Sequence, residues 1–228
     1  MPVIELITSS GLGSLLGMRH ALEPDHLAAV STLVSRERSS LRAAWLGLCW
    51  GAGHTLALLL VGIALVVLRT ELPSPVATTF EFAVSMMLVV LGLRAVRQAV
   101  LLGGSATGPS WVHRHFGQLH QHAGLEPHLH IGKWTVVRRP LLIGAVHGLA
   151  GSGALTALVL STLPSTTARI AYMALFGLGS AAGMAVLSGL LGWPLARFGA
   201  HHAVARAITL LVGCLSTGLG VLWAYRLL

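Results

Sequence analysis

Long apolar runs alternate with short polar segments along most of the chain. A helix needs about 20 apolar residues to cross a hydrocarbon core of about 30 Å. The pattern therefore predicts six membrane spans, at roughly residues 3–34, 41–68, 76–102, 140–163, 168–196 and 204–227. The stretch between the third and fourth spans is too hydrophilic to cross. We expect an all-α, polytopic membrane bundle organised as residues 1–102, a polar loop over residues 103–139, and residues 140–228.

The composition is that of a membrane protein. Of the 228 residues, 54% are hydrophobic and 10% are charged, and the mean hydropathy is +0.78; soluble domains average about 25% charged residues. The net charge of +8 would raise the question of nucleic-acid binding in a soluble chain. Here most basic residues stand between apolar runs, so we expect a lipid bilayer and no nucleic acid as partner.

The basic residues are unevenly divided between the two sides of the predicted bundle. Eleven lie on the side of residues 103–139, namely Arg36, Arg38, Arg42, Arg94, Arg97, Arg114, Lys133, Arg138, Arg139, Arg197 and Arg206. Three lie on the opposite side: Arg69, Arg169 and Arg226. Because cytoplasmic loops carry the excess of Lys and Arg, residues 103–139 are expected in the cytoplasm and both termini outside.

The two halves are weakly similar at an offset of about 126 residues. His20-Ala-Leu matches His147-Gly-Leu, and the run from Trp50 to His54 matches the run from Phe176 to Ser180, in the same order. Because each half has three spans, the second enters the membrane from the opposite side. This predicts a 3+3 inverted repeat, as in many secondary transporters, with a substrate site near the midplane. His147 and Ser180 become secondary candidates for metal binding or for the ion's path. Chance similarity between Gly-rich helices is the alternative.

An ionisable cluster, Arg19-His20-Ala-Leu-Glu23-Pro24-Asp25-His26, interrupts the first span. Such groups at bilayer depth are costly and usually face a cavity and partners. Pro24 lacks a backbone N–H, and its ring collides with the carbonyl four residues earlier. We therefore predict a broken first helix whose second half begins at Pro24. Arg19 and Glu23 are expected to pair with Asp25 or with each other.

His54, on the second span, is expected at the depth of His26. At 1.5 Å per residue, His26 lies about 14 Å from Ser35 and His54 about 18 Å from Arg42, near the middle of the bilayer. Imidazoles with a carboxylate suit nickel, cobalt, zinc or iron and poorly suit calcium or magnesium. The prediction is a midplane metal site of His20, Asp25, His26 and His54, with structural roles for single histidines as the alternative.

Six histidines stand in the polar stretch as three HxH pairs: His113, His115, His120, His122, His128 and His130. This spacing in a flexible loop can chelate late first-row metals in exchangeable fashion. We expect the loop to capture or hand over ions at the cytoplasmic mouth. A solvated polar linker is the alternative.

Two of these motifs resemble the nickel/cobalt transporter superfamily, which includes the urease-accessory UreH-type membrane proteins. The signature HX4DH stands here at residues 20–26, and the signature Leu-Gly-x2-Phe-x2-Gly-His-Ser/Thr stands at residues 46–55 with Trp50 in place of Phe. The resemblance implies nickel or cobalt as the transported substrate, and His20, Asp25, His26 and His54 as its binding positions. It also implies a bacterial plasma (inner) membrane location and urease or hydrogenase accessory proteins as partners.

The second half matches the family more loosely. Residues 175–179 are similar to the family's pattern, but Ser180-Ala-Ala-Gly183 follows where the larger permeases place acidic and hydroxyl residues. We expect a nickel or cobalt permease that is not an enzyme and has no organic cofactor, with uptake and efflux both open. A membrane-embedded metalloenzyme is a further alternative, although the chain has no HExxH motif. A metal-binding scaffold without transport is another.

Overall fold

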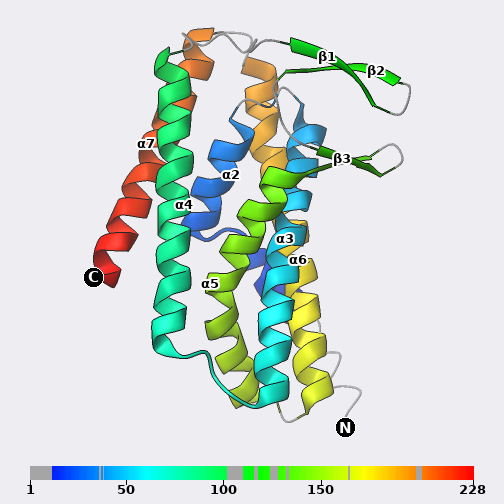
Figure 1. Cartoon of the computed structure of the whole chain (residues 1–228), viewed down its shortest axis with the longest axis vertical. Helices are drawn as coiled ribbons and strands as arrows, with labels where there is room; N and C mark the ends of the chain where they lie inside the picture. The colour runs from blue at the N-terminus through cyan, green and yellow to red at the C-terminus, as the bar shows by residue number, and fades with distance from the viewer. Residues whose placement is uncertain are drawn as a thin grey trace.

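The computed structural model describes residues 12–35, 37, 39–101, 110–115, 118–123, 128–131, 134–163, 165–198 and 202–228. Its helices are α2 (Pro24–Val34), α3 (Ser40–Leu68), α4 (Ser74–Leu101), α5 (Arg138–Thr162), α6 (Thr166–Phe198) and α7 (His202–Leu227) (Figure 1). Residues 12–20 are also helical and precede α2. The framework is all-helical, as predicted.

Four helices within the described residues are long and apolar enough to cross a membrane. They are Ser40–Leu68, Ser74–Leu101, Thr166–Pro194 and Ala203–Leu227. These ranges match the second, third, fifth and sixth predicted spans to within a few residues. The chain is therefore a membrane protein built on apolar helices.

The first predicted span is broken at the proline, as expected. Helical structure stops at His20, and α2 begins with Pro24 at its first position and Asp25 in its first turn. The three residues between form a turn, in which the Glu23 N–H donates to the His20 carbonyl at 3.0 Å. Pro24 has no N–H to donate to the His20 carbonyl, so the N–H of Glu23 in the turn bonds to it instead.

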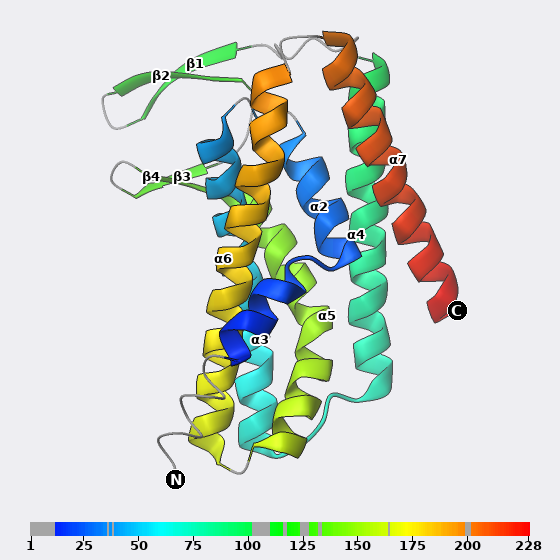
Figure 2. The ribbon, with the colours of Figure 1, turned by 180° about the vertical axis from the view of Figure 1, so that it is seen from behind.

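The helices form two packed groups (Figures 1 and 2). In one group α3 packs along both α5 and α6, and the Thr55 hydroxyl donates to the Gly177 carbonyl at 2.7 Å. In the other group α4 packs along α7, and the Ser216 hydroxyl donates to the Leu88 carbonyl at 3.0 Å. The helix α2 lies between the groups and contacts members of both.

Glycines let the helix backbones of the first group approach closely. The glycine contacts of the first half of the chain have counterparts in the second half. A Cβ on Gly17 would meet the Phe176 carbonyl, and one on Gly144 would meet the Trp50 carbonyl. Gly144 follows Gly17 by 127 residues, and Phe176 follows Trp50 by 126. The contact between residues 12–20 and α6 is thus equivalent, under the repeat, to the contact between α5 and α3. Small residues permit such approach between membrane helices.

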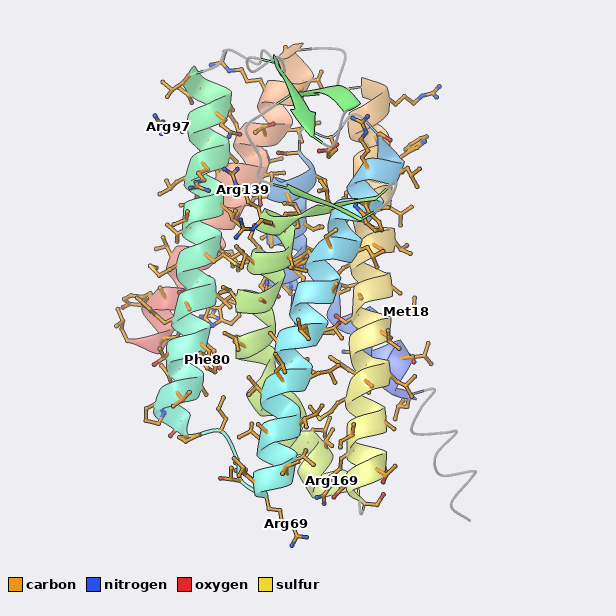
Figure 3. All side chains as sticks on the ribbon, turned by 45° about the vertical axis from the view of Figure 1, so that its right-hand side comes forward. Met18, Arg69, Phe80, Arg97, Arg139 and Arg169 are labelled. Carbon is orange, nitrogen blue, oxygen red and sulfur yellow. The ribbon has the colours of Figure 1, made fainter. Side chains whose placement is uncertain are left out.

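The polar stretch contains two β-hairpins at one end of the bundle, where a flexible loop was expected. Strand β1 (Ser110–His115) pairs with β2 (Gln118–Ala123), and β3 (His128–Ile131) pairs with β4 (Trp134–Val137), both antiparallel. Figure 3 shows Arg97 and Arg139 toward this hairpin end and Arg69 and Arg169 at the opposite end. These strands were not among the elements that the sequence predicted.

Candidate metal centre

The helix break turns two histidines toward each other. His20 ends the first helical segment and His26 lies in the first turn of α2, and their ring centroids are 4.5 Å apart. In an unbroken helix, residues six positions apart point in divergent directions at 100° per residue. The turn at residues 21–23 therefore creates the pair.

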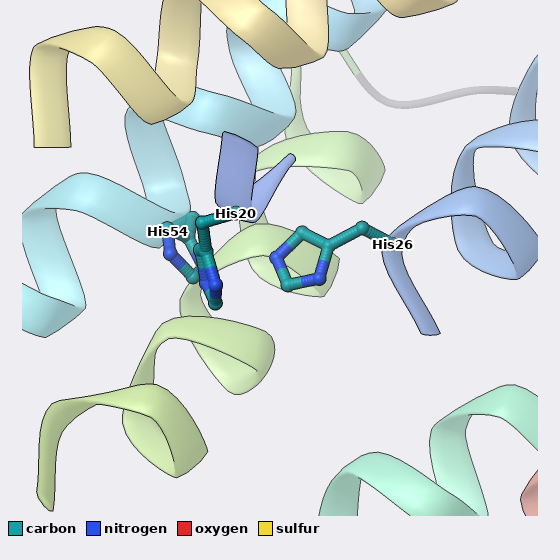
Figure 4. Close-up of side chains that lie close together, drawn as sticks. All are labelled: His20, His26 and His54. Carbon is teal, nitrogen blue, oxygen red and sulfur yellow. The ribbon is translucent and has the colours of Figure 1, made fainter. Parts of the chain in front are cut away.

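His54 completes a three-histidine cluster from α3. Its ring centroid lies 5.4 Å from that of His20 and 5.3 Å from that of His26, and the side chain is fully buried. Figure 4 shows the His26 ring extending toward the rings of the other two. Close packing sets this position, because a Cβ on Gly148 of α5 would meet the His54 carbonyl.

Carboxylates hold three rings of the site. The Nδ1–H of His20 donates to Glu23 at 2.9 Å, and the Nδ1–H of His26 donates to Asp25 at 3.1 Å. The other oxygen of Asp25 accepts from Nε2 of His147 at 2.7 Å. An ionised carboxylate only accepts hydrogen bonds, so these contacts place protons on the bonded nitrogens. Glu23 and Asp25 thus pair with histidines, whereas the sequence suggested that Arg19 and Glu23 pair with Asp25 or with each other.

The remaining imidazole nitrogens are buried without hydrogen-bond partners in the described part of the chain. They are Nε2 of His20, Nε2 of His26, both ring nitrogens of His54 and Nδ1 of His147. A buried polar group without a partner is costly. A carboxylate on one ring nitrogen and a metal ion on the other is the usual arrangement of ligating histidines. The orphaned nitrogens therefore fit a cation.

Two sets of side chains could hold such an ion. One is His20, His26 and His54, and the other is Asp25, His26 and His147; within each set the donor atoms lie within 4.8 Å of one another. The second set is already joined by hydrogen bonds through Asp25. The first set has free nitrogens. Three ligands with bonds of about 2.1 Å to one ion lie about 3.0 to 3.6 Å from one another, so the rings would have to move together by no more than about 1 to 2 Å to close on an ion.

An open cavity of about 810 Å³ reaches this cluster. It is lined by His20, Asp25, His26 and His147 together with Glu23, Arg19 and Glu81. Phe176 also lines it, 5.3 Å from the His20 ring, while Trp50 packs at 5.3 Å from the His26 ring. An ion could thus reach buried nitrogens from outside the bundle.

The candidates from the sequence divide into three groups. His20, Asp25, His26, His54 and His147 come together in one cluster. Ser180 is buried on α6 and its hydroxyl has no partner among the described residues, but it joins neither donor set. The side chains of His113, His115, His120, His122, His128 and His130 lie outside the described part of the structure.

Glu81 lines the cavity from α4 and was not among the residues predicted from the sequence. A signal for it was present, because Glu81 is a lone acidic residue inside the third apolar run. Asp25 was predicted to bind the metal like the histidines, whereas imidazoles engage both of its oxygens. Spacing along the chain carries no information on which atom a side chain presents.

Comparison with known proteins gives relatives that cover most or all of this chain. The chain is 30% identical to the urease accessory protein UreH of Bacillus sp. (strain TB-90) over 233 residues, covering 100% of this chain and 95% of that protein. It is 27% and 28% identical to the chloroplast proteins FOR GROWTH AND FERTILITY 2 and 1 of Arabidopsis thaliana, covering 82% of this chain and 48% and 50% of theirs. No solved structure matches.

A family model settles the relationship. The model described as NicO, high-affinity nickel-transport protein, matches residues 6–224, which is nearly the entire chain. The match includes the broken helix, His54 and the second half with His147. The chain therefore belongs to the NicO family of nickel-transport proteins, as the resemblance of its two motifs predicted.

Proposed function

We propose that this protein is a permease that carries nickel, or cobalt, across the bacterial plasma membrane through the site of His20, Asp25, His26 and His54. The observation that carries the proposal is the convergence of buried imidazole nitrogens without partners at the end of an open cavity. Imidazole suits nickel and cobalt and poorly suits magnesium or calcium. Family membership supports nickel as the substrate.

Within this site the histidines and the carboxylate have different roles. His20, His26 and His54 bind the ion directly, and three protein ligands leave coordination positions for exchangeable water, as a transported ion needs. Asp25 holds His26 and His147 in orientation through its two oxygens. His147 and Ser180 contribute to the path of the ion beside this set.

The protein works as six spans in a 3+3 inverted repeat. The matching contacts of Gly17 with Phe176 and of Gly144 with Trp50 support this architecture. Helix α3 runs away from the hairpin end and α6 runs toward it, as inverted units require (Figure 1). The excess of basic residues at the hairpin end supports a cytoplasmic position for residues 103–139, with both termini outside.

The histidines of the hairpins capture the ion on the cytoplasmic side. His113 pairs directly with His120 across the β1–β2 hairpin. In the second hairpin, His128 and His130 belong to β3, which pairs with β4. Uptake with delivery to urease or hydrogenase accessory proteins is the proposed direction, which the name of the UreH relative supports.

The test is the movement of radioactive nickel in cells that express the wild type or His26→Ala at equal membrane levels. We expect the wild type to raise cellular nickel and His26→Ala to abolish the rise. The control is Cys214→Ala at an exposed position of α7, which should behave as the wild type. Lowered cellular nickel with wild type would indicate efflux, and equal movement in both proteins would refute the proposed site. Nickel binding without movement in proteoliposomes would indicate a scaffold.

A further inference from the structure

Three carboxylates line one cavity of this protein. The sequence has seven acidic residues, and three of them, Glu23, Asp25 and Glu81, line the cavity that ends at the histidine cluster. Glu23 and Asp25 are engaged by His20, His26 and His147. Glu81 has no such engagement among the described residues. The position of Glu81 therefore needs a separate explanation.

Glu81 stands inside an apolar membrane helix. It follows the first residue of α4 by seven positions, which is about 10 Å along the helix axis. A carboxylate within a membrane span is costly and normally faces a water-filled cavity or a partner. Glu81 is half-buried and lines the cavity with Trp223 of α7. Its charge therefore faces the cavity.

The cavity extends from the histidines toward the end of the bundle that lies away from the hairpins. Leu158 lines it near the end of α5, and Tyr172 lines it near the start of α6. At its inner end His26 is 1% exposed, and its free Nε2 is among the buried nitrogens without partners. Glu81 thus lies on the wall of the route by which an ion reaches His26.

On the hairpin side the cluster is closed by apolar side chains. Val30, Val34, Trp50, Leu88 and Met184 are buried in one packed core. Among the residues that the structure describes, access to the histidines therefore leads through the cavity with Glu81 and not through this core. A fixed negative charge on the open route acts on every ion that enters.

We infer that Glu81 is a capture residue of the ion pathway, which attracts the hydrated divalent cation into the cavity before the imidazoles bind it. The inference rests on the proposed permease function. Oxygen ligands suit a cation that still carries its water shell, and a negative charge within low-dielectric walls raises the local concentration of cations. Transfer to His20, His26 and His54 then exchanges water for nitrogen ligands.

The test is the nickel concentration dependence of transport by Glu81→Gln, which removes the charge and keeps the shape. We expect the half-saturating nickel concentration to rise about four- to sixfold, which is the Coulomb effect that one unit charge has on a divalent ion across about 8 to 10 Å of water in general. The maximal rate should stay within about twofold. Because salt screens such attraction, the difference from wild type should shrink at high ionic strength. Glu81→Asp should restore most of the loss.

The matched control is Glu71→Gln, which removes an exposed carboxylate from the loop at the same end of the bundle. We expect it to leave the half-saturating concentration unchanged. The inference would be overturned if the half-saturating concentration of Glu81→Gln were unchanged, or if Glu71→Gln raised it equally. It would also be overturned if Glu81→Gln lowered only the maximal rate. Nickel stoichiometry of the purified variant should equal that of wild type, which excludes misfolding. Failure of wild type to move nickel would instead refute the permease function.

Discussion

At the scale of single residues, the site depends on which nitrogen each imidazole presents. Glu23 and Asp25 occupy the Nδ1 atoms of His20 and His26, and this leaves the two Nε2 atoms facing the cluster. His54 has no carboxylate and is held by the packing of α3 against α5. Two rings are thus set by electrostatic partners and one by close packing.

Replacing Asp25 with Asn should weaken nickel binding without changing its stoichiometry. An amide oxygen can accept from one imidazole, but its NH2 group would then face the other, so one of the two hydrogen bonds is lost. Loss of a partner behind a ligand usually costs about 10- to 100-fold in metal affinity. Titration calorimetry of the purified variant measures this loss, with Glu71→Gln as control. Complete loss of the bound ion would instead make Asp25 a direct ligand.

The sequence identified most members of the histidine cluster but not the contacts that they make. The motif of His20 to His26 and the depth of His54 identified the cluster, and the internal repeat brought in His147. The engagement of Asp25 by two histidines could not be predicted, because it depends on the approach of α5 to α2. Glu81 was missed because it stands alone, outside any motif.

At the scale of elements, the proline break is the feature that assembles the site. We expect Pro24→Ala to let the first helix continue, since Ala is the strongest helix former. His20 and His26 would then diverge, and nickel affinity should fall at least about tenfold, by analogy with other disruptions around metal ligands. Competition titration with a nickel indicator measures the affinity. The control is Pro194→Ala, which removes the proline inside α6 and should leave binding unchanged.

The close approach of α3 and α5 gives a second prediction. A Cβ at Gly148 would meet the His54 carbonyl, so Gly148→Ala should separate the two helices at the site. Overpacking of this kind costs about 1 to 3 kcal/mol, and we expect a lower melting temperature together with weaker nickel binding. At Gly218 of α7 a Cβ meets nothing within 4 Å. Gly218→Ala should therefore match wild type, and an equal loss in both variants would contradict the account.

The apolar pattern predicted the helical elements well, because the length of a membrane helix is dictated by the bilayer. The four helices of membrane-spanning length and the break at Pro24 all fall where the sequence indicated. The hairpins were missed. Alternation with period two in the HxH pairs is also the periodicity of a strand, and it was interpreted only as a chelating pattern.

At the scale of the whole molecule, the site lies between an open cavity and a closed apolar core. This predicts a difference in thiol access when single cysteines are introduced after Cys49 and Cys214 are replaced. Ala150→Cys, on the cavity wall, should react with a membrane-impermeant thiol reagent added outside intact cells, and nickel should slow the reaction. Val30→Cys, in the packed core, should not react. The reverse pattern would contradict both the orientation and the closed side.

X-ray absorption spectroscopy of the nickel-loaded, purified protein shows whether His20, His26 and His54 together bind the transported ion. We expect about three imidazole nitrogens at about 2.1 Å from the nickel, by analogy with metal–imidazole bonds in general, and the loss of one imidazole in each single Ala variant. A nickel ion surrounded by oxygen alone, or a spectrum unchanged when all three histidines are replaced, would contradict this expectation.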